Sequence, residues 1–274
     1  MHEQPLHQGG AAQPPLIWLL GGTGDGPPLA EALLQRGWRL RVSLVTAAAT
    51  RAYTPHPQLQ LLVGDLADDA AVERELQRQH PHWVVDATHP FAQHISARLE
   101  RVCRRIGQPL ERLERPSLAA DAAATAGTTV ALPGLAALAD LNLTGERLLL
   151  AIGSRQLAQA LAASNADAHY ARILDRPGSL QLALAAGLRD HQLACLRPSQ
   201  PQPGELEAGA LETALCRRWG ITAVLCRAGG GRSEALWRQV CHRLGLRLLL
   251  VQRPAGPGSD GLPLEPLLEK LGHP

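Results

Sequence analysis

The sequence predicts an α/β protein of two Rossmann-like domains, each with a parallel sheet and helices on both faces, and with a ligand cleft between the domains. Two observations predict this fold class. Short apolar runs typical of buried strands alternate with segments of helical spacing along most of the chain. The length of 274 residues also suits two domains better than one.

The first alternating series begins with the apolar run 16–22, which ends in glycines. A helix follows, with Pro27 and Pro28 in its first turn, where a missing N–H costs nothing, and with Gly37 as its stop. The remaining elements of this series are strands at 38–46, 59–66, 82–88 and 109–116, with helices at 68–79 and about 91–106.

The second series follows the stretch 119–134, which is rich in small residues and has no periodicity. Its expected strands are 146–153, 168–174, 193–198, 221–231 and 246–254, and its helices are 154–163, 178–187, 207–219 and 232–244. The tail from Ala255 is rich in Pro and Gly, with one helical turn expected at 264–271. We therefore expect a disordered leader over 1–15, a nucleotide-binding domain over 16–118, a boundary segment over 119–145 and a second α/β domain over 146–274.

Composition excludes several classes of function. A net charge of +2 without a block of basic residues argues against a nucleic-acid partner. No apolar run approaches the roughly 18 residues that a membrane span needs. The five cysteines are scattered without a C-x-x-C pair, which argues against disulfides and a zinc site and fits the cytoplasm. We expect no metal, and nothing in the sequence requires more than a monomer.

The turn after the first strand, GGTGDG at 21–26, is the first candidate site. Glycines there let the backbone approach a pyrophosphate, which the N-terminus of the next helix attracts. The glycines Gly21, Gly22, Gly24 and Gly26 follow a G-x-x-G-x-G spacing and not the usual G-x-G-x-x-G. A dinucleotide site is the favoured interpretation, and a plain tight turn is the alternative.

The residues after the second strand favour NADPH, with NADH as the alternative. No Asp or Glu occurs from Ala32 to Gly64, so no carboxylate repels a 2′-phosphate. Arg51 is our candidate for that phosphate, beside Thr46, although it could equally be a solvated loop residue. Asp65, after the third strand, either contacts adenine or caps the following helix. The same interval also holds Ser43, Arg36, Arg39 and Arg41.

The segment VVDATHPFAQHIS, 84–96, is the second candidate site, because it leaves a strand at the sheet edge where α/β folds bind ligands. Asp86 and Thr88 would face the nicotinamide or the substrate, and His89 could donate a hydrogen bond or a proton. Alternatively or in addition, Thr88 caps the next helix and Pro90 begins it. A metal site lacks ligands, since His89 and His94 are five residues apart, and a serine hydrolase lacks G-x-S-x-G.

Several motifs, taken together and in order, resemble the precorrin-6A reductases of cobalamin biosynthesis. They are GGT at the first turn, VVDATHPFAQHIS, LERP after the next helix, AIGSRQL, and AGGGRSEALWRQVCHRLGLRLLLVQRP. The resemblance covers roughly residues 16–254. It implies a reductase that moves a hydride from a nicotinamide cofactor to one double bond of the precorrin-6A macrocycle, or of its cobalt complex, to give precorrin-6B.

The resemblance also implies site residues by position. Gly21, Gly22 and Thr23 would hold the cofactor phosphates, and Asp86, Ala87 and Thr88 would line the cleft. The other cofactor candidates follow from the residues themselves and not from the resemblance: they are Gly24 and Asp25 in the same turn, and Thr46, Arg51 and Asp65 after the next two strands. The tetrapyrrole residues would be His89, Pro90, Phe91, Gly153, Arg155, Arg227, Gly229, Gly230 and Gly231, with His89 as the catalytic candidate. Because the substrate carries many carboxylates, Arg155, Arg227, Arg232 and Arg253 are candidate partners for them.

Departures from the family pattern concern mainly the second domain. Arg227 stands at a lysine position, Gly229 at a serine position, and LRPSQPQPGE replaces RGPF. Two other functions are alternatives. A short-chain-type reductase of another small molecule is disfavoured, because neither tyrosine has a lysine four residues on. A non-catalytic protein that binds NADPH or a tetrapyrrole would keep the glycine turn but show no turnover.

Overall fold

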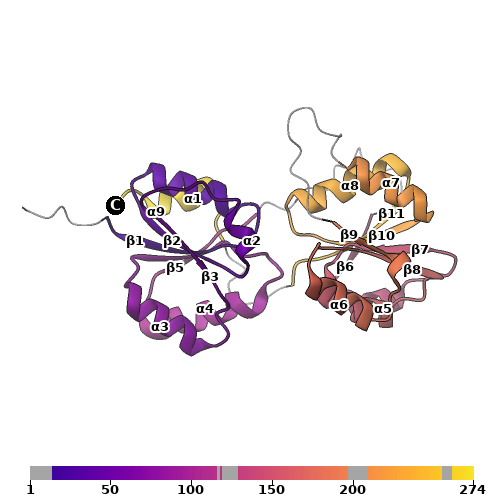
Figure 1. The fold of residues 1–274 in the computed structure, drawn as a ribbon, viewed down its shortest axis with the longest axis horizontal. Helices are drawn as coiled ribbons and strands as arrows, with labels where there is room; N and C mark the ends of the chain where they lie inside the picture. The colour runs from indigo at the N-terminus through magenta and orange to yellow at the C-terminus, as the bar shows by residue number, and fades with distance from the viewer. Residues whose placement is uncertain (1–13, 116–117, 119–128, 197–208, 255–260) are drawn as a thin grey trace, which may run out of the picture. The chain divides into compact units, whose positions relative to one another are not determined.

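The computed structural model describes residues 14–115, 118, 129–196, 209–254 and 261–274 (Figure 1). The chain divides into two compact units, one from Met1–Glu114 with Gly256–Pro274 and the other from Arg115–Ala255. The expected disordered leader falls mostly on 1–13, outside the described residues, as does the Pro-rich segment 197–208.

The first unit begins with a βα series and ends with a helix from the far end of the chain. Its elements are β1 (Leu16–Leu20), α1 (Gly26–Gln35), β2 (Arg39–Leu44), α2 (Ala47–Thr50), β3 (Leu59–Val63), α3 (Asp69–Gln79), β4 (Trp83–Asp86), α4 (Gln93–Ile106), β5 (Leu110–Arg112) and α9 (Leu264–Leu271). Pro27 and Pro28 lie in the first turn of α1, and Gly37 follows that helix with a φ of +93°, as the sequence predicts.

The second unit repeats the alternation. Its elements are β6 (Thr129–Leu132), η1 (Leu135–Asp140), β7 (Arg147–Leu150), η2 (Ser154–Gln156), α5 (Leu157–Ala163), β8 (Ala168–Ile173), α6 (Pro177–Ala185), η3 (Asp190–Gln192), β9 (Leu193–Cys195), α7 (Ala210–Trp219), β10 (Ala223–Arg227), α8 (Arg232–Leu244) and β11 (Arg247–Val251). The bounds of α8 agree with the predicted 232–244, whereas 264–271, where the sequence predicts one helical turn, form the whole of helix α9.

Both sheets consist of parallel strands, which confirms the predicted α/β class with two Rossmann-like domains. The order is β3-β2-β1-β4-β5 in the first sheet and β6-β11-β10-β7-β8-β9 in the second. In the first sheet, and from β7 onward in the second, the chain builds outward on one side and then crosses to the other, whereas β6 lies at the edge beside β11. The crossing takes place between β1 and β4 in the first sheet, and between β7 and β10 in the second.

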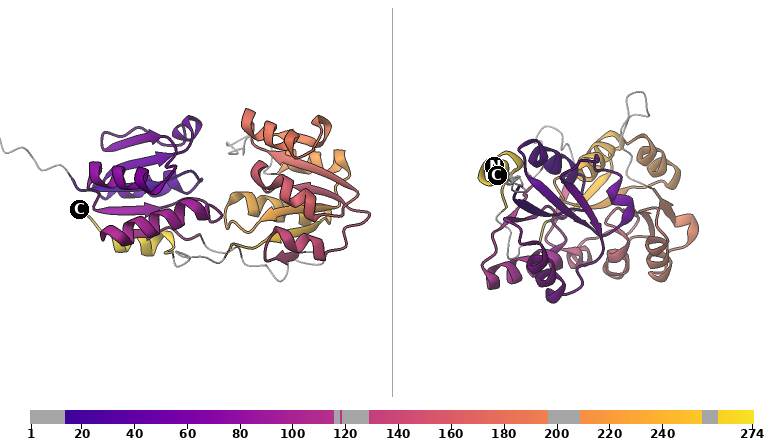
Figure 2. Two further views of the ribbon diagram at one scale, coloured as in Figure 1. Left: turned by 90° about the horizontal axis from the view of Figure 1, so that it is seen from below. Right: turned by 60° about the vertical axis from the view of Figure 1, so that its left-hand side comes forward.

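Helices cover both faces of each sheet, as Figures 1 and 2 show for each unit taken by itself. In the first unit, Ile17 and Leu19 of β1 pack in the core beneath α1 and α9, whereas Trp18 and Leu20 pack beneath α3 and α4. This alternation follows from the period of two along a strand. Because both faces are buried, β1 is apolar throughout.

The C-terminal residues correct the expected domain division, which placed all of 146–274 in the second domain. Leu262 lies beside Leu113 and accepts a hydrogen bond from the N–H of Glu114 (2.8 Å). Leu267 and Leu271 of α9 are buried in the core of the first unit. The sequence shows that α9 has an apolar face, but not which core that face joins.

The boundary segment expected over 119–145 also needs correction. Its residues 119–128 lie outside the described part of the chain, but Thr129–Leu132 form β6, which pairs with β11. Leu135 and Leu138 of η1 are buried. The short TVAL strand was missed because small residues surround it and no apolar alternation marks it. None of the helices that the structure describes is long and apolar enough to span a membrane.

The docking of α9 predicts a stability effect in the first unit. Leu267 is fully buried, so Leu267→Ala should lower the free energy of unfolding by about 2–5 kcal/mol through lost burial and a cavity. Glu269→Ala, at an exposed position of the same helix, is the control and should change it by less than about 0.5 kcal/mol. Urea unfolding measures both, and equal effects would contradict the docking.

Candidate functional site

The two motifs of the first unit leave the sheet next to each other. β1 and β4 are paired, with Leu20 opposite Asp86, so the glycine turn and the DATHP segment both begin at the carboxyl edge. This is the place where the strand order reverses, and ligands of open α/β sheets bind outside the carboxyl ends of strands at such a place. The sequence-predicted residues Gly21–Asp25 and Asp86–Phe91 are therefore brought together.

The four glycines of the turn differ in whether the structure could accept a side chain at their positions. Gly22 has a φ of +128°, a conformation that other residues rarely adopt. A Cβ atom at Gly21 or Gly26 would lie 2.5 or 2.3 Å from the hydroxyl oxygen of Tyr53. Gly24 has open space, with no atom within 4 Å of its Cβ position. Only Gly22 and Gly24 are exposed, so they alone present a glycine backbone to a ligand.

Thr23 ties the glycine turn to the end of β4. Its hydroxyl lies 3.2 Å from the carbonyl oxygen of Ala87 and 3.4 Å from a carboxylate oxygen of Asp25. The N–H of Ala87 in turn donates to the carbonyl of Leu20 (2.9 Å). The two segments therefore hold each other at a fixed distance.

Asp86 is a buried carboxylate whose hydrogen bonds fix the segment after β4. Its side chain is 3% exposed, and one carboxylate oxygen accepts hydrogen bonds from the N–H (2.9 Å) and the hydroxyl (2.6 Å) of Thr88. The other oxygen lies 3.3 Å from the guanidinium of Arg112. A buried carboxylate needs such partners. Asp86 and Thr88 thus bond to each other, whereas we expected both side chains to face a ligand.

The start of α4 corrects the proposed role of Thr88 and Pro90 in that helix. α4 begins at Gln93, its N-cap is Ala92, and no side chain caps it. Thr88 is not the cap, because its hydroxyl donates to Asp86, and Pro90 lies in the preceding turn. The sequence suggested the cap because Thr before Pro is typical of a helix start.

His89 has a defined orientation within this segment. Its Nδ1 accepts a hydrogen bond from the N–H of Phe91 (3.2 Å), and the two rings lie 5.7 Å apart. When the ring is neutral, Nδ1 is therefore the acceptor and the proton is on Nε2. His89, Pro90 and Phe91 are all partly exposed.

The basic residues of the second strand separate into different environments. Arg41 is buried and pairs with Glu75 of α3 (3.5 Å), and Arg39 begins β2 at the amino edge. Ser43 is engaged by the indole N–H of Trp18 (2.9 Å). At the carboxyl edge are Thr46, the N-cap of α2, and Arg51, which is exposed.

Asp65 is exposed after β3, at the same edge of the sheet. The alternative that it caps α3 is wrong. Asp68 is the N-cap of that helix, and its carboxylate accepts from the N–H of Ala71 (2.7 Å).

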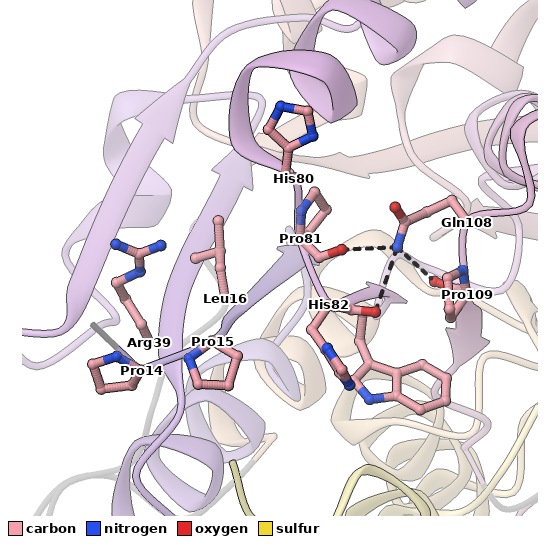
Figure 3. A pocket seen from close by; sticks show the side chains of 10 residues that line it. Pro14, Pro15, Leu16, Arg39, His80, Pro81, His82, Gln108 and Pro109 are labelled. Carbon is pink, nitrogen blue, oxygen red and sulfur yellow. Dashed lines mark hydrogen bonds between the residues drawn. The ribbon is translucent and has the colours of Figure 1, made fainter. Parts of the chain in front are cut away.

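A cavity of about 450 Å³ lies at the opposite, amino edge of the first sheet (Figure 3). The amide of Gln108 donates to the carbonyl of Pro81 (3.0 Å), which joins the chain entering β5 to the chain entering β4. We do not place the cofactor there, because the glycine turn is at the other edge. The lining residues are Pro14, Pro15, Leu16, Arg39, His80, Pro81, His82, Trp83, Gln108 and Pro109.

The second unit has a comparable site at the ends of β7 and β10. Gly153 follows β7 with a φ of +85°, and its Cβ position lies 3.8 Å from the guanidinium of Arg227 at the end of β10. Gln156 accepts two hydrogen bonds from that guanidinium (3.1 and 2.6 Å). Burial lowers the pKa of Arg227, although it stays a cation at neutral pH. Arg155 is exposed beside them.

Hydrogen bonds with buried or partly buried side chains fix the turn Gly229–Gly231 before α8. Glu234, itself buried and paired with Arg238 (2.8 Å), accepts a hydrogen bond from the N–H of Gly230 (2.8 Å). Arg253 donates to the carbonyls of Ala228 (3.0 Å) and Arg115 (2.8 Å). Arg253, expected to meet substrate carboxylates, thus supports the turn, and the exposed Arg232 begins α8.

Sequence reasoning missed three residues of these sites. Tyr53 packs beneath the glycine turn, Gln156 orients Arg227, and Glu234 holds Gly230. Gln156 is part of the AIGSRQL motif, but its partner Arg227 is 71 residues away along the chain. Glu234 is only four residues from Gly230, but the sequence does not show that its side chain turns back to that N–H. Within the described residues, no group of three or more His, Cys, Asp or Glu side chains is placed to hold a metal ion.

Comparisons with known proteins confirm the resemblance that the motifs indicated. Residues 16–270 match the family model for the precorrin-6x reductase CbiJ/CobK. The chain is 32% identical over 243 residues to a cobalt-precorrin-6A reductase of Synechocystis sp., covering 87% of this chain and 88% of the relative. It is 31% identical over 247 residues to a precorrin-6A reductase of Rhodobacter capsulatus, covering 89% and 90%. A solved structure of CobK precorrin-6A reductase superposes with a TM-score of 0.70 at 27% identity, covering 94% and 96%.

The unequal roles of the glycines predict unequal effects of alanine. Gly26→Ala places a methyl group against the Tyr53 hydroxyl and should lower the free energy of unfolding by about 1–3 kcal/mol. Gly24→Ala meets open space and should change it by less than about 0.5 kcal/mol. Adding Tyr53→Phe to Gly26→Ala should recover stability, since the next atom is 3.5 Å away. Thermal unfolding of the ligand-free protein measures these values, and equal losses at Gly24 and Gly26 would contradict the assignment.

Proposed function

The chain belongs to the precorrin-6x reductase family, and we propose that it reduces one double bond of the precorrin-6A macrocycle, or of its cobalt complex, with a hydride from NADPH. It is an oxidoreductase of corrin ring synthesis, and its relatives are named for the reduction of both forms of the macrocycle. The observation that carries the proposal is the family match over residues 16–270, which includes the motifs at both strand-order reversals.

The proposed cofactor site is the carboxyl edge of the first sheet. Gly22 and Gly24 would approach the pyrophosphate with their backbone, and Thr23 and Asp25 complete that turn. Arg51 and Thr46 would meet the 2′-phosphate, and Asp65 the adenine. In the same proposal Gly21, Asp86, Ala87 and Thr88 shape the site from behind, because each is buried or engaged by a neighbour.

The proposed tetrapyrrole residues include a group at the carboxyl edge of the second sheet. Gly153 leaves room beside Arg227, whose planar guanidinium suits a carboxylate, and the exposed Arg155 adds a second cation. Gly229, Gly230 and Gly231 would let the chain approach the ring closely. The acidic periphery of the macrocycle supports this assignment.

For this reaction the protein mainly has to bind NADPH and the macrocycle and orient them toward each other. NADPH, when bound, supplies the hydride to a carbon of the conjugated ring, and a proton completes the reduction. His89, Pro90 and Phe91 would line the reacting region. His89 has its ring proton on Nε2 when neutral, so it can donate a hydrogen bond or that proton to the ring. Orientation and exclusion of water account for the rest of the rate.

Turnover tests the function directly. NADPH oxidation should accelerate on addition of precorrin-6A or of cobalt-precorrin-6A, and the faster form identifies the natural substrate. A reductase of another small molecule would accept neither. A non-catalytic binding protein would bind NADPH or the macrocycle without oxidising the cofactor.

The proposed contact of Arg51 predicts a change in cofactor preference. Arg51→Ala should raise the KM for NADPH about five- to tenfold and leave that for NADH nearly unchanged, because only NADPH carries the 2′-phosphate. Arg74→Ala, at an exposed position of α3, is the matched control. Steady-state kinetics with both cofactors measure the effect. Equal changes in the two KM values would show that Arg51 does not contact the 2′-phosphate.

The proposed donor role of His89 predicts a loss of turnover. His89→Ala should lower kcat about 100-fold at saturating NADPH and macrocycle, within the range for a general acid. His94→Ala, at an exposed position early in α4, should retain kcat. A raised KM with unchanged kcat would instead make His89 a binding residue only.

A further inference from the structure

Tyr53 joins the loop after β2 to the glycine turn after β1. It follows α2, and its N–H donates to the carbonyl of Thr50 (3.1 Å). Its side chain is 7% exposed and belongs to the core of the first unit. The ring tip reaches the turn, where the hydroxyl oxygen occupies the space that a Cβ of Gly21 or Gly26 would need.

The hydroxyl of Tyr53 is buried without a hydrogen-bond partner. Among the residues that the structure describes, its oxygen has no hydrogen-bond partner. Burial raises the pKa of the phenol to about 12, so the group stays a neutral O–H donor at physiological pH. A buried polar atom without a partner is unfavourable, and phenylalanine would fill the same space without that cost. Packing alone therefore does not account for the oxygen.

The first turn of α1 is short of N–H donors for a phosphate. The first residue of α1, Gly26, donates its N–H to the carbonyl of Thr23 (3.3 Å), and Pro27 and Pro28 have no N–H. A helix N-terminus normally binds phosphate through these first N–H groups. Here α1 contributes its dipole, while hydrogen bonds to the anion must come from the rest of the turn and from side chains beside it.

We propose that Tyr53 is a positioning residue for the dinucleotide, whose hydroxyl gains a partner when the cofactor occupies the turn. The partner is a phosphate oxygen or a water molecule bound to it. This inference rests on the proposed function. Because the turn covers the oxygen, the bond forms as the turn adjusts to the cofactor. Since the pyrophosphate is common to both cofactors, Tyr53 acts equally on NADPH and NADH.

Tyr53→Phe separates this role from packing, because it should move stability and affinity in opposite directions. The unfolding temperature of the ligand-free protein should stay the same or rise, since an unpartnered oxygen is removed. The Kd for NADPH should increase about tenfold, and that for NADH by the same factor, as expected for a lost hydrogen bond to a charged group. Calorimetric titration and thermal unfolding give the two values.

Tyr170→Phe is the matched control, because the chain has only two tyrosines. The Tyr170 hydroxyl is already engaged by Arg147, and the ring stacks on Trp219, all in the second unit. Its loss should lower the unfolding temperature and leave both Kd values unchanged. An unchanged Kd for Tyr53→Phe, or a lowered unfolding temperature that accounts for weaker binding, would overturn the proposal.

A spectroscopic test of the unmutated protein is independent of these variants. With tyrosine labelled by carbon-13 at the phenolic carbon, NADPH should shift the Tyr53 resonance and leave that of Tyr170 in place. If NADPH binds and neither resonance moves, the inference on Tyr53 fails while the proposed function stands. If neither NADPH nor NADH binds to the unmutated protein, the proposed function fails and the inference with it.

Discussion

The parallel pairing of β1 with both β2 and β4 is the constraint on which the first unit depends. Leu20 lies opposite Ser43 on one side and Asp86 on the other, so three loops leave the sheet at the same level. Hydrogen bonds continue the register past the strands, from the N–H of Gly21 to Ser43 and from that of Ala87 to Leu20. A slip of one residue would exchange the two buried faces of β1 and separate the glycine turn from the DATHP segment.

Asp86 belongs to the most recognisable motif of the sequence, but its side chain is buried and shapes the backbone instead of facing solvent. A carboxylate that is 3% exposed would be costly without partners, and Thr88 and Arg112 supply them. Its two bonds to Thr88 bend the chain directly after β4, and His89 and Phe91 follow in the next turn. The motif is therefore as specific for the shape of this bend as for any group that touches a ligand.

The sequence was sufficient for the features that depend on local pattern. Alternating apolar runs and helical spacing predicted every strand but β6, and the bounds of α8, because both faces of each sheet are buried. It was insufficient where the partner is distant. Nothing local indicates that α9 completes the first core, that Thr88 bonds back to Asp86 instead of capping α4, or that Tyr53 explains two glycines. Each depends on a contact between elements.

The second sheet reaches a comparable arrangement with different side chains. Gly153 opens space at the end of β7, and Arg227 enters it from the end of β10. Gln156 is a neutral amide, so its hydrogen bonds orient the guanidinium without themselves cancelling its charge. Glu234 meanwhile takes the N–H of Gly230, which removes a backbone donor that a carboxylate could use. Under the proposed function, attraction of the acidic macrocycle to this edge would depend on arginine side chains more than on the glycine turn.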